Sequence, residues 1–318
     1  MPCLEPITLK DRHPYEEIYH RYRDYSQRSI HVPCGRCIMC KNREQMEWSF
    51  RLQQEDKVSQ NNRFITLTYD NLFLPLNDDG DYPDLSKRDV QLYLKRLRKL
   101  NTKMMLEYYP TEKVARAHLK TRPLRYFLVG EYGTEYGRPH YHALIFNTAP
   151  NLFDDPVATW QLGDVDVGTV QPESIAYTTK YMVKPLDQLK TQVKRMKEFR
   201  LTSKGHGLQY AKDNALYHIS NKKFTVRNQA GMDIPMPRYI RDQIFSSKDD
   251  STNRKFRYML LDHFIKKQSE QIENFQKQVV KLSGSYPDPW MEIANRPYQE
   301  AKLKQNRIRY EFTKRKIG

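Results

Sequence analysis

A short segment with two histidines constrains the fold of this chain more than any other part of its sequence. Residues 139–146 read Pro-His-Tyr-His-Ala-Leu-Ile-Phe, and their apolar and aromatic content is typical of a β-strand. Successive side chains of a strand point to opposite faces, so His140 and His142 share one face. A turn with two glycines separates this run from a second strand-like run, residues 124–131. We therefore expect a β-hairpin over residues 124–146.

The hairpin also brings a carboxylate to the histidines. Glu131 ends the first strand, and folding the hairpin back places it beside His140. Two imidazole nitrogens and one carboxylate oxygen leave positions on a metal open for water or a phosphate oxygen, which is typical of a catalytic site. Alone, a histidine pair in a strand is more often structural, and Glu131 alone is a surface carboxylate. Their combination predicts a metal site formed by Glu131, His140 and His142.

A helix expected over residues 173–184 carries two tyrosines. Tyr177 and Tyr181 are one turn apart and lie on one face, which Lys184 continues and Lys180 flanks. One interpretation is two half-buried rings with solvated lysines. The other is nucleophilic catalysis, in which a tyrosine hydroxyl attacks a metal-polarised phosphodiester and a lysine favours the phenolate.

The charge of the chain favours a polyanionic partner. Its 318 residues include 54 Lys and Arg against 38 Asp and Glu, a net charge of +16, and 22 tyrosines. Nucleic acid is the default partner for such an excess of positive charge. Because no run approaches the ~20 apolar residues of a membrane span and the first residues do not resemble a signal peptide, we expect a cytosolic protein without a membrane partner.

Periodicity predicts the remaining elements. After the expected N-cap Ser86, apolar residues recur at helical spacing up to Leu100. The opposite side of this helix is basic, and DNA contact and a solvated face are equally compatible with it; its cations are Lys95, Arg96, Arg98 and Lys99. Further strands are expected at 63–69 and around 165–170, and further helices at 42–58, 254–282 and 298–316.

All four cysteines lie near the beginning of the chain. Cys34, Cys37 and Cys40 are spaced by two residues and offer three soft ligands, for which Cys3 or His31 is a candidate fourth. A structural zinc would stabilise a short segment with little core of its own. An iron–sulfur cluster is compatible with the spacing but lacks a clear fourth cysteine nearby. Three reduced thiols in a tight turn remain the alternative.

Taken together, these motifs resemble those of a known family. Histidine-hydrophobe-histidine on a strand, followed by a helical tyrosine, is similar to the pattern of HUH endonucleases, and Glu131 stands where rolling-circle Rep families carry a third ligand. More narrowly, the chain resembles the replication initiators of gokushovirus-type Microviridae over residues 31–240. Residues Phe64–Tyr69 look like the first motif of the HUH family, and the narrower resemblance is carried by Cys34-Gly-Arg-Cys37, Gly137–His142, Tyr177–Tyr181 and Pro235–Tyr239.

The resemblance implies an α+β fold: a central antiparallel sheet with flanking helices, followed by a mainly helical, basic C-terminal region. It predicts three parts, with a cysteine knuckle and helix in residues 1–60, the nuclease core in 61–200 and the C-terminal region in 201–318. The implied activity is nicking of one DNA strand at the viral origin, with a 5′-phosphotyrosine link and later rejoining into circular single-stranded DNA.

The resemblance also implies the partners. They are Mg²⁺ or Mn²⁺ at the catalytic site, origin DNA in single-stranded and replicative double-stranded form, and a host helicase and polymerase in the bacterial cytoplasm. Arg138 is assigned to DNA binding. No P-loop motif is present in the sequence, so strand separation is expected to need another protein.

Two other functions remain open on the sequence. A non-catalytic single-stranded nucleic-acid binder would use the basic, aromatic surface but leaves Glu131, His140 and His142 unexplained. A metal nuclease with water as nucleophile would make Tyr177 and Tyr181 spectators.

Overall fold

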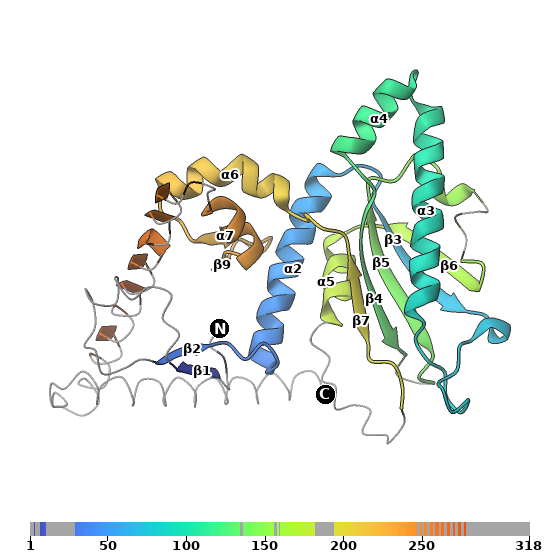
Figure 1. Ribbon diagram of the computed structural model, residues 1–318, viewed down its shortest axis with the longest axis horizontal. Helices are drawn as coiled ribbons and strands as arrows, with labels where there is room; N and C mark the ends of the chain where they lie inside the picture. Colours follow the sequence, from blue (N-terminus) through green and yellow to red (C-terminus); the bar gives the residue numbers. More distant parts are fainter. Residues whose placement is uncertain are drawn as a thin grey trace. The chain divides into compact units, whose positions relative to one another are not determined.

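The computed structural model describes most of the chain between residues 29 and 246 (Figure 1). The described ranges are 29–133, 136–155, 160–181 and 194–246, with Cys3, residues 7–10, Ala158 and scattered positions from 249 to 277. The chain divides into two compact units, residues 45–214 and residues 1–44 with 215–318. The helix predicted at 298–316, Lys184 and most of the helix predicted at 254–282 lie outside the described residues. The division into three parts stays a prediction.

A five-stranded antiparallel sheet is the centre of the unit formed by residues 45–214. Its order is β6-β3-β5-β4-β7, so the histidine strand β5 is the middle one. The predicted α+β fold with a central antiparallel sheet is thereby confirmed. The strands are β3 (Arg63–Tyr69), β4 (Arg125–Tyr132), β5 (Pro139–Phe146), β6 (Gly163–Thr169) and β7 (Phe199–Thr202).

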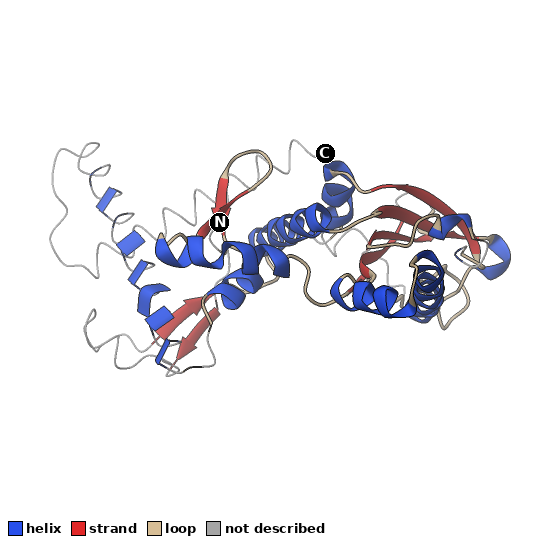
Figure 2. Ribbon diagram, turned by 90° about the horizontal axis from the view of Figure 1, so that it is seen from above, coloured by secondary structure: helices blue, strands red, loops and turns tan. Residues whose placement is uncertain are grey.

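Helices cover this sheet on both faces (Figure 2). One face packs against α3 (Lys87–Tyr108), which begins as predicted because the hydroxyl of Ser86 accepts the backbone N–H of Asp89. The next helix along the chain is α4 (Glu112–Thr121), which was not predicted from the sequence. The apolar side of α3 faces the core with Val90, Tyr93, Leu94, Leu97, Leu100 and Met105.

The second face of the sheet packs against α5 (Pro172–Lys180) and against the part of α2 (Ile38–Val58) that belongs to this unit. Pro172 is the first residue of α5, as expected for a residue without a backbone N–H donor. The apolar layer between these helices and the sheet consists of Trp48, Leu52, Phe127, Val129, Leu144, Phe146 and Ile175. This face also carries the candidate site.

The other unit is built from short elements, most of which have no periodic signal in the sequence. Helix α2 begins at Ile38 and not at the predicted residue 42, because the backbone N–H of Lys41 already donates to the carbonyl of Cys37. This unit also contains β1 (Ile7–Lys10), β2 (Ser29–Val32), the end of α6 (Leu208–Ser220), β8 (Thr225–Arg227), β9 (Asp233–Pro235) and α7 (Arg238–Ile244). The short helices η1 (Asn71–Phe73) and η2 (Leu152–Asp154) belong to the unit of residues 45–214. No helix among the described residues is both long and apolar enough to cross a bilayer.

A buried ion pair joins α2 to the sheet. Glu55 is 2% exposed and accepts hydrogen bonds from Arg125 at 2.9 and 3.1 Å and from the backbone N–H of Gly207 at 3.1 Å. His206 lies beside it, and burial lowers the pKa of this imidazole to about 4. Removing the carboxylate takes the main acceptor from a partly buried guanidinium, which keeps the carbonyl of Gly205, and takes the acceptor from a buried amide.

We predict that Glu55→Ala lowers the free energy of unfolding by about 3 kcal/mol, because it breaks a buried pair from one side. Arg116→Ala is the matched control: it removes an exposed pair with Glu112 on α4, and we expect a loss of at most about 0.5 kcal/mol. Urea unfolding followed by circular dichroism measures both. Equal losses for the two variants would contradict the role of Glu55.

Candidate active site

The register of three strands gathers the predicted ligands on one face of the sheet. Glu131 in β4 lies directly opposite His140 in β5, and His142 lies opposite Val129. On the other side of β5, Thr66 of β3 faces His142. Residues directly opposite each other in antiparallel strands share a face. Glu131, His140 and His142 therefore all lie on the face that α5 covers.

Glu131 and His142 contact each other directly. Nε2 of His142 lies 3.1 Å from Oε1 of Glu131, and the two side chains are 8% and 5% exposed. The other ring nitrogen, Nδ1, lies 3.1 Å from the hydroxyl of Thr66. Both nitrogens are thus fixed by neighbours, which orients the imidazole. The alternation of β3 places Thr66 on this face, and that signal could have identified it as a site residue.

Tyr177 of α5 and Tyr181, the residue that caps the C-terminal end of this helix, lie against this pair. The helix predicted over 173–184 ends at Lys180. The ring of Tyr181 stacks on His142 with centroids 5.4 Å apart, and the ring of Tyr177 meets His142 edge-on at 5.0 Å. The tyrosine rings are 5.1 Å from each other. Phe64 stacks against His142 at 6.0 Å. The spacing of four residues on a helix therefore brings both phenols to the same histidine.

Tyr177 and Tyr181 differ in environment. The side chain of Tyr177 is 43% exposed, whereas Tyr181 is partly buried and its hydroxyl hydrogen-bonds to Tyr177 and to Glu131. Burial, together with these two neighbours, raises the pKa of Tyr181 well above the ordinary value. A proton on Tyr181 is thus held by the carboxylate until something offsets the charge of Glu131.

Only some of the predicted donor atoms are spaced as ligands of one hard divalent ion. An ion that binds ligands at ~2.1 Å in an octahedron holds neighbouring donors about 3 Å apart, and Nε2 of His142 and Oε1 of Glu131 are 3.1 Å apart. His140 completes no such set: among the described residues, the cysteines alone form a group of three or more donors that all lie within 4.8 Å. A Cβ on Gly133 would come within 2.8 Å of the His140 imidazole, so the glycine leaves room for this ring.

The predicted basic residues lie in several places. Lys180 is exposed on α5, and Lys184 lies outside the described residues. Arg138 donates to the carbonyl of Tyr69 at 2.8 Å and to Oδ1 of Asn71 at 2.6 Å. The α3 cations are on the face of the sheet opposite the tyrosines, with Lys95, Arg98 and Lys99 exposed and Arg96 partly buried.

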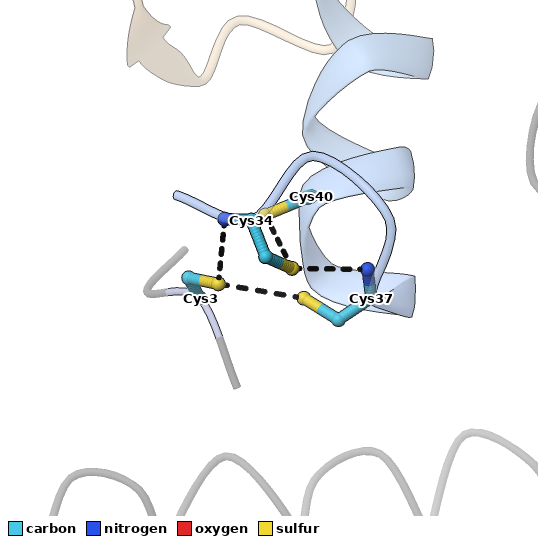
Figure 3. Close-up of side chains that lie close together, drawn as sticks. All are labelled: Cys3, Cys34, Cys37 and Cys40. Atoms are coloured by element: carbon cyan, nitrogen blue, oxygen red, sulfur yellow. Dashed lines mark hydrogen bonds between the residues drawn. The ribbon is translucent and has the colours of Figure 1, made fainter. Parts of the chain in front are cut away.

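The cysteines form a second cluster, in the unit that contains residues 1–44 (Figure 3). Cys3, Cys34, Cys37 and Cys40 place their sulfur atoms within 4.8 Å of one another. The backbone N–H groups of Cys37 and Arg36 lower the pKa of the Cys34 thiol to about 6. Burial raises the pKa of the Cys40 thiol to about 12.

Comparison with known proteins shows which replication-associated proteins the chain resembles. Residues 62–186 match the model of the replication-associated protein ORF2/G2P family. The chain is 26% identical over 299 residues to the replication-associated protein VP4 of Bdellovibrio phage phiMH2K, covering 89% of this chain and 87% of that protein. It is 25% identical to the replication-associated protein ORF2 of Spiroplasma virus 4, covering 91% and 92%. No solved structure matches the chain.

The resemblance to phage replication-associated proteins is confirmed. The matched residues 62–186 run from the start of β3 to beyond α5. They therefore include every residue of the candidate active site, while the cysteine cluster precedes them.

We predict that Tyr181 remains a phenol at pH 10, where an ordinary tyrosine is half ionised. Replacing Glu131 by Gln removes a negative charge beside the hydroxyl, so the pKa of Tyr181 falls. Carbon-13 NMR of ring-labelled tyrosines measures the titration, and Tyr181→Phe identifies the signal. A Tyr181 signal that titrates at the ordinary value, unchanged by Glu131→Gln, would contradict the proposed hydrogen bond.

Proposed function

We propose that this chain initiates phage DNA replication by nicking one strand at the origin with a tyrosine nucleophile. The observation that carries the proposal is the contact of Tyr177 and Tyr181 with His142, which itself contacts Glu131. Two phenols beside a buried imidazole–carboxylate pair are not needed for simple nucleic-acid binding. The similarity to phage replication-associated proteins and the net charge of +16 support DNA as the substrate.

The proposed reaction is a transesterification at phosphorus. A tyrosine Oη forms a bond to the scissile phosphorus, the bond from phosphorus to the 3′ oxygen breaks, and the 3′ oxygen takes a proton to become a hydroxyl. For Tyr181 the phenolic proton has an acceptor in place, because its hydroxyl already hydrogen-bonds to Glu131. A divalent ion, Mg²⁺ or Mn²⁺, held by Glu131 and the histidines would polarise the phosphate and offset its charge.

The environments of the two tyrosines suggest an order. Tyr177 is the more exposed of the two tyrosines, so a phosphate can reach its hydroxyl directly. Tyr181 must first give up its hydrogen bond to Glu131. We therefore assign the first nick to Tyr177 and the cut of the regenerated origin to Tyr181. While one tyrosine holds the 5′ end, the other cleaves, and the free 3′ hydroxyl closes the circle.

The partners follow from this activity. Lys180 is exposed one position before Tyr181 and is proposed, with Lys184, to stabilise the phosphate charge. The exposed cations of α3 are proposed to contact DNA away from the tyrosines. A host helicase would separate the strands and a host polymerase would extend the 3′ hydroxyl, which places the reaction in the bacterial cytoplasm.

We predict that His142→Ala lowers the rate of origin nicking by about 100-fold or more, because it removes a metal ligand that also orients Glu131. Oligonucleotide binding should stay within a few-fold, since affinity depends on phosphate contacts elsewhere. His140→Ala should behave in the same way. The measurement is cleavage of a labelled origin oligonucleotide in Mg²⁺ or Mn²⁺. His118→Ala on α4 is the control, and normal nicking by either site variant would refute the metal site.

The tyrosines are tested by covalent capture of the DNA. We predict that Tyr177→Phe lowers the rate of the first nick about tenfold and that Tyr181→Phe changes it less, because the exposed hydroxyl attacks first. The double variant should bind origin DNA but form no adduct. Denaturing gels with 5′- and 3′-labelled oligonucleotides measure adduct formation, and a circular template measures circle release.

Both single variants should fail to release circles, because each full round needs two hydroxyls. Tyr108→Phe on α3 is the matched control and should act as the unmodified protein. An adduct formed by the double variant would exclude these nucleophiles. Cleavage without any adduct would favour a nuclease that uses water, and binding without cleavage in the unmodified protein would favour a non-catalytic binder.

A further inference from the structure

The four cysteines stand at the spacing of ligands around one metal ion. The sulfur atoms of Cys3 and Cys37 are 3.7 Å apart, and those of Cys34 and Cys40 are 4.0 Å apart (Figure 3). A tetrahedron with zinc–sulfur bonds of ~2.3 Å has sulfur atoms about 3.8 Å apart. A disulfide would need about 2.05 Å.

The same sulfur–sulfur distances argue against an iron–sulfur cluster. In a four-iron cluster each cysteine binds a different iron, so the thiolates surround the whole cluster and lie farther apart than around one ion. All four sulfur atoms here lie within 4.8 Å of one another. Four thiolates at single-ion spacing suit zinc or one iron ion, since soft sulfur ligands exclude Mg²⁺ and Ca²⁺; zinc, which has no redox chemistry, is the usual ion of a closed structural site.

The backbone around the cysteines is arranged for thiolates. The N–H of Cys37 donates to the sulfur of Cys34 at 3.3 Å, and the N–H of Cys34 donates to the sulfur of Cys3 at 3.2 Å. Such donors offset the negative charge that four thiolates bring to one divalent ion. The turn that directs these N–H groups toward the sulfur atoms contains Gly35, whose backbone angle φ is +75°. A residue with a side chain adopts this angle only at a cost in free energy.

The fold explains how Cys3, which lies 31 positions before Cys34, reaches the other three cysteines. Strands β1 and β2 are antiparallel, with Ile7 opposite Val32. Cys3 precedes Ile7 by four residues and Cys34 follows Val32 by two, so both belong to the same end of the strand pair. Helix α2 begins at Ile38 and carries Cys40 in its first turn.

We propose that Cys3, Cys34, Cys37 and Cys40 bind one Zn²⁺ in a closed structural site. Four protein ligands leave no position for water or substrate, so the ion stabilises and does not catalyse. It ties Cys3 to the segment 34–40 and fixes the N-terminal end of α2. Zinc thereby replaces the apolar core that short strands cannot supply. This site is independent of the proposed nicking chemistry.

The test counts metal in the full-length protein, purified without a polyhistidine tag. Mass spectrometry of the metals should find about one equivalent of zinc, and the His142→Ala variant should keep it, which excludes the active site as its source. Protein loaded with Co²⁺ should show the intense visible bands of a tetrahedral thiolate site. A thiol reagent should release the zinc, while dialysis against Mg²⁺ should not.

A pair of variants identifies the fourth ligand. Cys3→Ser should reduce the zinc content well below one equivalent after dialysis against a chelator and weaken the sulfur-to-cobalt charge-transfer band. His31→Ala should change neither. Both variants retain the Cys34–Cys40 segment, and circular dichroism confirms that the sheet is still folded.

Several results would overturn the proposal. Iron with acid-labile sulfide would establish a cluster, and one equivalent of iron without sulfide would establish a single-iron site in place of zinc. Thiols that resist alkylation in metal-free protein until a reductant is added would establish disulfides. Folded protein with four free thiols and no metal, or loss of zinc in His31→Ala but not in Cys3→Ser, would exclude this ligand set.

Discussion

The contact between Glu131 and His142 determines what the rest of the site can do. It depends on the register of β4 and β5, which sets Glu131 opposite His140. A slip of one residue would turn Glu131 to the α3 face of the sheet and separate it from both histidines. With the register as it is, one buried carboxylate contacts an imidazole on its own sheet and the phenol of Tyr181 at the C-terminal end of α5. The charge of Glu131 thus helps to raise the pKa of Tyr181 and would also set the affinity for the proposed metal ion.

Tyr181 can contact this carboxylate, and Tyr177 can contact His142, because α5 is held in place by its other residues. Ile175 is 1% exposed in the apolar layer, and the hydroxyl of Thr179 lies 2.9 Å from that of Ser49 on α2. Helix α2 is in turn fixed to the sheet by the ion pair of Glu55 with Arg125. Buried contacts on one side of α5 therefore leave Tyr177 exposed on the other, where DNA would approach.

Local patterns predicted the elements that form the site, and non-local contacts account for what was missed. Alternation identified β3 and the β4–β5 hairpin, and Ser86 marked the start of α3, because these signals are contained in a few consecutive residues. Strand β7 has only four residues and is defined by pairing with β4, which no local pattern records. The sequence placed Cys3 as one of two candidates because a separation of 31 residues says nothing of distance in space. The basic side of α3 could be recognised from the sequence, but the face of the sheet on which it lies could not.

The two proposed metal sites differ in donor chemistry, and this difference assigns their ions. Four thiolates bind zinc and reject Mg²⁺, whose hard charge prefers oxygen ligands and retained water. Two imidazoles and one carboxylate are weaker and leave positions open, which a reacting phosphate needs. A closed thiolate set at the active site would hold its ion too completely to bind a phosphate. An open nitrogen and oxygen set in the short-stranded unit would hold its ion too weakly to replace a core. The four cysteines already stand at single-ion spacing, whereas at the active site only Glu131 and His142 do, and His140 would have to approach them when the ion binds.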